Sequence, residues 1–353
     1  MRRLGIWLGT LLACAAAFGA VQAAQPPSTI GRIGPIQDRF DAIGAPLKSL
    51  TLPNGRTIHY IDTGEAGWRP VLFIGGTGTS ARAFEMTEFL QTLRRQLKLR
   101  VIAVERNGFG ETALTPGWSY GNYVDEVRTV LGHLGATRFS AVAISGGGPY
   151  LAHIAAAMPE QLISVHMLAA ATRRPAADPV CTLSSAALAD LIRSTIQNPA
   201  AWWAFPTTSP THNIPGFTER ARDEGARAFF IRGQMGDPAP QVAEAKRYCD
   251  PVADVSRVGA PVFIYQGTAD LSVPMASADY WRTHFPNVAR MRVYAGEGHD
   301  IQYRHWDQVL VDISGHSDLT VICAKGRSRA VPEARAQALM KSGASLGTCA
   351  WRN

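Results

Sequence analysis

The sequence predicts an α/β fold in which a mostly parallel central sheet is covered by helices on both faces. From residue 71 onward, apolar runs of strand length alternate with stretches of helical period, an order typical of βαβ units. The runs are continuously apolar, as expected for strands that are buried on both faces. They lie at residues 71–74, 101–104, 139–144, 163–168, 261–265 and 291–294, and the helices lie around 84–97, 123–134, 150–157, 276–284 and 301–313.

Further segments complete the predicted organisation. Alternating runs at residues 47–52 and 57–61 flank Asn54-Gly55 and predict a β-hairpin. The alternation of strands and helices stops at 173–258. There, helical patterns, prolines and aromatic residues predict a helical cap over the carboxyl ends of the strands. The predicted divisions are a lead segment at 24–46, a core at 47–172 and 259–313, this cap, and a small C-terminal segment at 314–353.

The N-terminus has the pattern of a secretory signal peptide at residues 1–23. Arg2 and Arg3 precede an uncharged apolar stretch, and small residues at 21–23 suit cleavage. The apolar stretch is short for a membrane span, so we expect no stable membrane insertion. Lipoprotein anchoring at Cys14 is a minor alternative. The expected location is therefore secreted or periplasmic.

The cysteine count supports an oxidising compartment. Removal of residues 1–23 leaves four cysteines, which permit three disulfide pairings. The pairs Cys181–Cys249 and Cys323–Cys349 each fall within one predicted segment, so sequence neighbourhood favours them. Buried free thiols are the alternative.

The positive charge is confined to the two ends of the chain. Of the formal net charge of +7, Arg2 and Arg3 supply +2 and residues 324–353 supply +5, which leaves the residues between without net charge. Lysine and arginine do not cluster in the core, so we expect no nucleic-acid partner. A solvated basic face is favoured for the final segment over binding to an anionic surface.

Ser145 ends an apolar run and begins a turn of small residues that leads into a helical stretch. A serine on such a strand-to-helix turn is the pattern of a nucleophile elbow, whose strained backbone requires small residues two positions away on each side. Here those residues are Ala143 and Gly147, whereas the usual motif has glycine at both positions. Taken alone, the pattern also fits an ordinary turn serine.

Two further residues follow later strands of the predicted sheet. A serine hydroxyl needs a base that accepts its proton, and the base needs a third group that orients it. Asp270 follows the strand predicted at 261–265, and His299 follows the next strand. Because the carboxyl ends of parallel strands meet at one edge, we expect Ser145, Asp270 and His299 to form a catalytic triad. Taken singly, Asp270 also fits a helix N-cap and His299 a surface histidine.

Other titratable residues compete for these roles. Asp300, Asp125 and Glu126 are the alternative acids, and Asp270 is preferred because its loop neighbours that of His299 in the expected strand order. His153 and His166 lie in apolar runs and are interpreted as packed core residues. No paired His/Cys spacing predicts a metal site and no glycine loop followed by lysine predicts a phosphate site, so we expect no metal and no cofactor.

Residues 47–313 resemble a cap-bearing α/β-hydrolase. The order Ser145, Asp270, His299 is that of the family. The stretch Phe73-Ile74-Gly75-Gly76-Thr77 is similar to its His-Gly-rich oxyanion loop, with Gly75 where histidine is common. Arg106-Asn107-Gly108-Phe109-Gly110-Glu111-Thr112 resembles its Arg-Pro-Gly-x-Gly-x-Ser turn, with asparagine in place of proline. The resemblance implies an α/β-hydrolase fold and an oxyanion hole made by the backbone N–H groups of Thr77 and Gly146.

These features favour an exported serine hydrolase that acts through an acyl-enzyme on carboxylic esters. The expected substrate is a small molecule with an apolar acyl or ring part. Six aromatic residues of the cap are candidates to line an apolar entrance for such a substrate, and the alternative is that they form the core of the cap itself. They are Trp202, Trp203, Phe205, Phe217, Phe229 and Phe230. A lactonase or an aminopeptidase-like hydrolase is one alternative, and a non-catalytic binding protein on the same fold is another.

The aminopeptidase alternative needs acidic residues in the cap that hold an α-ammonium group. The candidates are Glu219, Asp223, Glu224 and Glu244, and they are matched by Arg220, Arg222, Arg227 and Lys246. A solvated helix of mixed charge is therefore the favoured interpretation of these residues.

Overall fold

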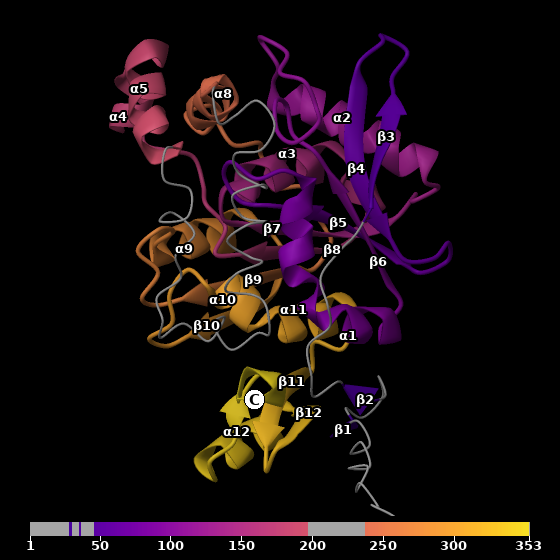
Figure 1. Ribbon diagram of the computed structural model, residues 1–353. Helices are drawn as coiled ribbons and strands as arrows, with labels where there is room; N and C mark the ends of the chain where they lie inside the picture. The colour runs from indigo at the N-terminus through magenta and orange to yellow at the C-terminus, as the bar shows by residue number, and fades with distance from the viewer. Residues whose placement is uncertain (1–27, 30–34, 37–45, 197–236, 353) are drawn as a thin grey trace, which may run out of the picture.

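The computed structural model describes residues 28–29, 35–36, 46–196 and 237–352 (Figure 1). Its central feature is an 8-stranded sheet in the order β10-β9-β8-β7-β5-β6-β4-β3. All neighbouring strands from β10 to β6 are parallel, whereas β4 and β3 continue the sheet antiparallel. The strands are β3 (Leu47–Thr51), β4 (Thr57–Thr63), β5 (Arg69–Ile74), β6 (Leu99–Val104), β7 (Phe139–Ile144), β8 (Leu162–Leu168), β9 (Val262–Gly267) and β10 (Val288–Tyr294).

Helices cover both faces of this sheet, as the apolar strands predict. Every residue of β6, β7 and β9 is buried, because alternate side chains pack against opposite layers. On one face, α2 (Tyr120–His133), α3 (Gly148–Ala157) and α9 (Met275–His284) pack on Leu72, Ala141 and Ile264. On the other face, Val71, Val142 and Phe263 contact a second helical layer formed by η2 (Ala81–Leu90), α1 (Gln91–Gln96), α10 (Ile301–Arg304) and α11 (Trp306–Ile313).

Two predicted helices differ in form from the expectation. The helix expected at 84–97 is a 3₁₀ segment, η2, followed by the short α1. The helix expected at 301–313 is interrupted at His305, whose backbone leaves the helical region at φ −118° and ψ 24°. The His305 ring stacks on Tyr294 and its Nε2 lies 2.8 Å from Glu297 Oε2, and these contacts fix the interruption.

The described part of the predicted cap contains α4 (Pro179–Thr182), α5 (Ser185–Ile196) and α8 (Ala239–Arg247). Residues 197–236 of the predicted cap, which include its six aromatic residues, lie outside the described residues. A disulfide between Cys181 and Cys249 joins α4 to the end of α8. No helix among the described residues is long and apolar enough to cross a membrane.

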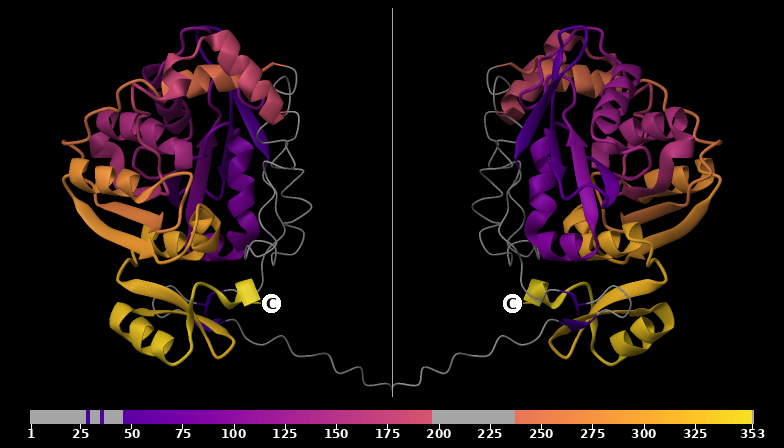
Figure 2. Two further views of the ribbon diagram at one scale, coloured as in Figure 1. Left: turned by 90° about the vertical axis from the view of Figure 1, so that its left-hand side faces the viewer. Right: turned by 90° about the vertical axis from the view of Figure 1, so that its right-hand side faces the viewer.

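The C-terminal segment lies at the end of the molecule opposite the cap helices (Figures 1 and 2). It forms a 3-stranded antiparallel sheet of β11 (Leu319–Ala324), β12 (Arg327–Pro332) and β13 (Ser345–Leu346), with α12 (Glu333–Lys341) and η6 (Cys349–Arg352). A short pair of strands, β1 (Ser28–Thr29) and β2 (Pro35–Ile36), precedes the main sheet in the chain. The second disulfide, Cys323–Cys349, lies within the C-terminal segment.

Candidate active site

Ser145 occupies a sharp turn between β7 and α3. Its φ of +50° lies in the left-handed region that non-glycine residues rarely adopt. The turn is possible because its neighbours are small: a Cβ on Gly147 would lie 2.7 Å from the carbonyl oxygen of Ile74 and 2.9 Å from that of Gly75. Ala143 is fully buried beside Ile74 in the sheet, so its methyl group is accommodated. The local backbone is therefore that of a nucleophile elbow.

The loops after β9 and β10 bring Asp270 and His299 to the same edge of the sheet. Tyr294 pairs with Gly267 in the register, so the two strands end level. The loops are then tied to each other, because the N–H of Ala269 donates to the carbonyl of Glu297 at 2.9 Å. His299 Nε2 lies 3.0 Å from Ser145 Oγ, and His299 Nδ1 lies 2.8 Å from Asp270 Oδ2. Three residues far apart in the sequence thus form one hydrogen-bonded chain.

The Asp270 carboxylate is held in place by its own loop. Oδ1 accepts the backbone N–H groups of Ser272 and Val273, both at 2.9 Å. Burial alone would raise the pKa of Asp270, but the hydrogen bond and charge of His299, together with these N–H groups, bring the pKa below its ordinary value. Asp270 is therefore an anion at neutral pH and fixes a proton on the facing Nδ1 of His299.

The competing acids have other structural roles. Asp300 directly precedes α10 and lines the cavity, and its side chain makes no capping hydrogen bond to that helix. Glu126 is buried and accepts hydrogen bonds from Arg56 Nε at 2.6 Å and from Trp118 Nε1 at 3.0 Å. Asp125 pairs with Arg128 on the surface. Both ring nitrogens of His299 already have partners, because Nδ1 faces Asp270 and Nε2 faces Ser145.

The other two histidines of the apolar runs are packed, as interpreted from the sequence. His166 is fully buried in β8, where its ring nitrogens contact Ser164 and Tyr265. His153 is part-buried, and its ring stacks on Tyr120. Neither is a site residue.

The loop after β5 faces the elbow across the site. A Cβ on Gly146 would lie 2.9 Å from the backbone nitrogen of Thr77, so a side chain at residue 146 would collide with the loop backbone. Among the described residues, no hydrogen bond uses the N–H of Thr77. The loop backbone at Thr77 thus lies close to the residue that directly follows Ser145, as the predicted oxyanion hole requires.

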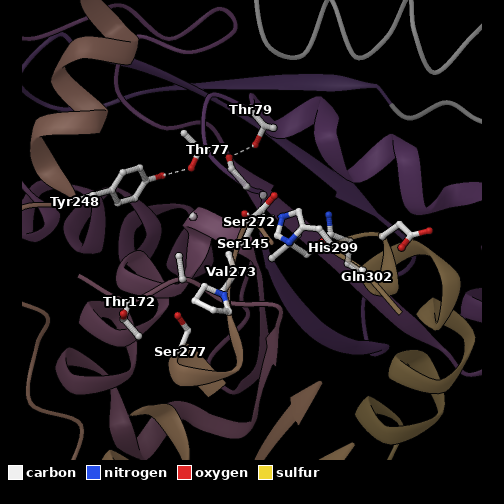
Figure 3. Close-up of a pocket in the computed structure, with 18 of the residues that line it drawn as sticks. Thr77, Thr79, Ser145, Thr172, Tyr248, Ser272, Val273, Ser277, His299 and Gln302 are labelled. Atoms are coloured by element: carbon white, nitrogen blue, oxygen red, sulfur yellow. Dashed lines mark hydrogen bonds between the residues drawn. The ribbon is translucent and has the colours of Figure 1, made fainter. Parts of the chain in front are cut away.

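Three residues, none of them assigned to catalysis from the sequence, hold this loop. The guanidinium of Arg106 donates to the carbonyls of Gly75 at 3.0 Å and Gly76 at 2.5 Å. Arg106 Nε also pairs with Glu244 Oε1 at 3.2 Å. The third residue is Tyr248, whose hydroxyl contacts Thr77 Oγ1 at 3.2 Å (Figure 3). In the sequence, the resemblance of residues 106–112 to a family motif was the one sign that Arg106 matters, and it did not indicate what Arg106 does.

The interpretation of Glu244 as part of a solvated helix is wrong. Its side chain is buried, because Arg106 neutralises the carboxylate and the N–H of Gly78 donates to Oε2 at 2.6 Å. Lys246 does not pair with it and donates instead to the carbonyls of Cys181 and Leu183. Burial raises the pKa of Glu244, and the charge of Arg106 opposes this rise. The other acidic residues of that group, Glu219, Asp223 and Glu224, lie outside the described residues.

A cavity of about 1490 Å³ opens over Ser145 and His299. Figure 3 shows the His299 ring beside Ser145, with Ser272, Val273 and Gln302 around the two. The wall is mixed: Phe73, Ile144, Val273 and Tyr280 contribute apolar surface, and hydroxyl groups come from Thr77, Thr79, Thr172, Ser272 and Ser277. Among the described residues, no group of three or more His, Cys, Asp or Glu side chains could hold a metal ion.

The fold and the elbow define a class of protein, and comparison with known proteins agrees with it. Residues 71–313 match the Alpha/beta hydrolase family, to which this chain therefore belongs. No curated protein sequence matches the chain.

Three solved structures with a similar fold are distant from this chain in sequence. An esterase from Rhodococcus sp. ECU1013 superimposes with a TM-score of 0.58 at 17% identity, covering 78% of this chain and 98% of that chain. A carboxylesterase structure from Nitrososphaera gargenis gives 0.57 at 19% identity, covering 76% and 99%. An enol-lactonase from Burkholderia xenovorans LB400 gives 0.55 at 16% identity, covering 75% and 99%. At these identities the likeness concerns the fold.

Proposed function

We propose that this protein is an exported serine hydrolase that cleaves carboxylic esters of small molecules through an acyl-enzyme. The observation that carries the proposal is the hydrogen-bonded chain from Asp270 through His299 to Ser145 at the base of an open cavity. A serine hydroxyl bonded to an imidazole that is itself held by a carboxylate is the arrangement that activates serine as a nucleophile.

The geometry supports an acyl transfer in two steps. His299 Nε2 removes the Ser145 proton while Ser145 Oγ attacks the ester carbonyl, and Asp270 stabilises the imidazolium that forms. The N–H groups of Thr77 and Gly146 bind the negative oxygen of the tetrahedral intermediate. His299 then donates its proton to the departing alcohol oxygen, leaving the acyl group on Ser145. A water molecule, deprotonated by His299, hydrolyses this acyl-enzyme and restores the serine.

Two observations support an ester as substrate over a peptide. The structural neighbours include an esterase and a carboxylesterase, and the enol-lactonase among them keeps a lactone as the alternative. An aminopeptidase needs a free carboxylate for the substrate ammonium group, and Glu244 is already paired with Arg106.

Export is supported by the signal-like pattern at residues 1–23 and by two disulfides. A mature N-terminus near residue 24, measured from the mass of secreted protein, tests the export.

A substrate panel tests the proposed function. It compares p-nitrophenyl esters, lactones and aminoacyl p-nitroanilides with the wild type, Ser145→Ala, His299→Ala and the control Asp300→Asn. We expect ester hydrolysis that falls by on the order of 10⁴-fold or more in both alanine variants, because each removes a member of a unit that acts together. Asp300→Asn should stay within about threefold of wild type, since the carboxylate that faces His299 Nδ1 is that of Asp270.

A fluorophosphonate probe separates an enzyme from a binding protein. The wild type should react covalently at Ser145, and Ser145→Ala should not. A wild type that never reacts with the probe, or alanine variants that hydrolyse esters at the wild-type rate, would contradict the proposal.

A further inference from the structure

Two side chains of the cap segment, residues 173–258, reach the oxyanion loop, residues 75–79 after β5. Glu244 lies on α8 and Tyr248 directly follows it, and they are only 3% and 5% exposed. Glu244 Oε2 accepts the N–H of Gly78 at 2.6 Å, and the Tyr248 hydroxyl accepts the hydroxyl proton of Thr77 at 3.2 Å. Figure 3 shows the Tyr248 hydroxyl pointing at Thr77. Thr77 and Gly78 are thus bound by one short segment that lies 166 to 171 positions later in the chain.

The core also binds the same loop. Arg106 donates to the carbonyls of Gly75, Gly76 and Thr79, at 3.0, 2.5 and 2.9 Å. Its charge is balanced by Glu244, with Nε 3.2 Å from Oε1. Glu244 therefore supports the loop in two ways: it accepts the N–H of Gly78 directly, and it keeps the buried Arg106 in position.

The loop requires such support because of its sequence. Thr77 is flanked by Gly76 and Gly78, and Gly78 has a φ of +74°. Glycines leave the backbone free to rotate, so the direction of the N–H of Thr77 is not fixed by local sterics. A Cβ on Gly146 would lie 2.4 Å from the Tyr248 hydroxyl and 2.2 Å from Thr77 Oγ1. Tyr248 thus packs beside both proposed donors of the oxyanion hole.

We propose that Tyr248 and Glu244 are positioning residues by which the cap segment fixes the oxyanion hole. The inference rests on the proposed function and extends it: the cap segment is part of the catalytic apparatus as well as a cover for the substrate. Oxyanion donors act only when they are oriented before the reaction, so loss of the Tyr248 hydroxyl weakens binding of the transition state more than binding of the ester.

Tyr248→Phe tests this role, with Tyr120→Phe as the matched control. The Tyr120 hydroxyl also joins the core to this cap segment, donating to the carbonyl of Arg247 at 3.2 Å, but it does not reach the loop. On a p-nitrophenyl ester, we expect Tyr248→Phe to lower kcat by about 5- to 50-fold with KM changed by less than about threefold, a smaller loss than removal of a donor itself. Tyr120→Phe should keep kcat within about twofold of wild type.

A double-variant cycle identifies the hydrogen bond responsible. Thr77→Val removes the hydroxyl that binds Tyr248 and keeps the backbone N–H. Because both substitutions break the same contact, the combined variant should lose no more kcat than the worse single variant. Independent, multiplying losses would overturn the proposed contact.

The remaining outcomes are also decisive. Unchanged kcat in Tyr248→Phe, or equal losses in Tyr248→Phe and Tyr120→Phe, would overturn the positioning role while the proposed hydrolase function stands. A wild type that hydrolyses no ester and does not react with a fluorophosphonate would overturn both.

Discussion

At the scale of single residues, the elbow depends on the absence of side chains as much as on Ser145. The positive φ of Ser145 stores strain that the surrounding backbone must hold. Gly147 permits this because its α-carbon faces the carbonyls of Ile74 and Gly75, which belong to β5 and to the loop that carries Thr77, a proposed oxyanion donor. The backbone at these positions is thus shared by the nucleophile and the oxyanion loop.

Gly147→Ala should therefore damage both stability and activity. Its new methyl carbon would lie 2.7 Å from a backbone carbonyl oxygen, so the turn or β5 must move. We expect a loss of about 1–3 kcal/mol in the free energy of unfolding and a fall in kcat, measured by urea unfolding and ester hydrolysis. Gly132→Ala is the control: it lies exposed on α2 with no atom within 4 Å of the new carbon, and it should gain up to about 1 kcal/mol. A Gly147→Ala protein as stable and active as wild type would contradict the steric argument.

At the scale of elements, the sequence was most informative where burial is continuous. The runs at 101–104 and 139–144 became β6 and β7 because strands covered on both faces need apolar residues at every position. The edge strand β12 was not predicted, since arginines interrupt its apolar residues. Its Ser328 and Ala330 are buried while Arg327 and Arg329 are exposed, a period of two that marks a half-buried strand.

The candidate site was predictable only in part, for a related reason. Ser145, Asp270 and His299 each follow a recognisable strand, so the topology alone brings their loops together. The contacts of Tyr248 and Glu244 depend on how the cap segment folds over the core, and no local pattern encodes this. Glu244 has a lysine two positions later and gives the signal of a solvated helix, although Arg106 is its partner.

The two disulfides should differ in their effect on catalysis. Cys249 directly follows Tyr248, and its bond to Cys181 anchors the end of α8, whereas Cys323–Cys349 lies within the C-terminal segment. Replacement of either pair by alanine should cost about 2–5 kcal/mol of unfolding free energy. Only the Cys181/Cys249 replacement should also lower kcat, because it frees the segment that holds the oxyanion loop. Urea unfolding and kcat of both double variants provide the measurement, and an equal effect on kcat would argue against a coupling through the cap segment.

At the scale of the whole molecule, the C-terminal segment is joined to the core through buried polar and aromatic contacts. The N–H of Thr348 donates to Asp307 Oδ2 at 2.6 Å, and the N–H of Val321 donates to Gln308 Oε1 at 2.8 Å. The Trp351 ring packs edge-on against Phe89 with centroids 5.6 Å apart.

The basic side chains remain on the outside of this segment, where Lys325, Arg327, Arg329, Arg335 and Lys341 are exposed. The segment thus shares the apolar core of the main sheet while carrying the net positive charge.

The stability of the whole molecule should depend on pH through a histidine that takes no part in the proposed chemistry. His166 is fully buried in β8 and its ring stacks on Phe263. Burial lowers its pKa from 6.5 to about 3. In the unfolded chain this histidine binds a proton near pH 6.5, whereas in the folded protein it stays neutral. Its contribution to stability is therefore complete above about pH 6.5 and is lost as the pH falls toward 3.

Unfolding in urea at a series of pH values checks this linkage. Between about pH 6 and 4.5 we expect the free energy of unfolding to fall by up to about 1.4 kcal/mol per pH unit through His166 alone. His166→Gln should make the slope shallower by close to that amount. Equal slopes in the wild type and His166→Gln would show that His166 accepts a proton in the folded protein, in conflict with its burial.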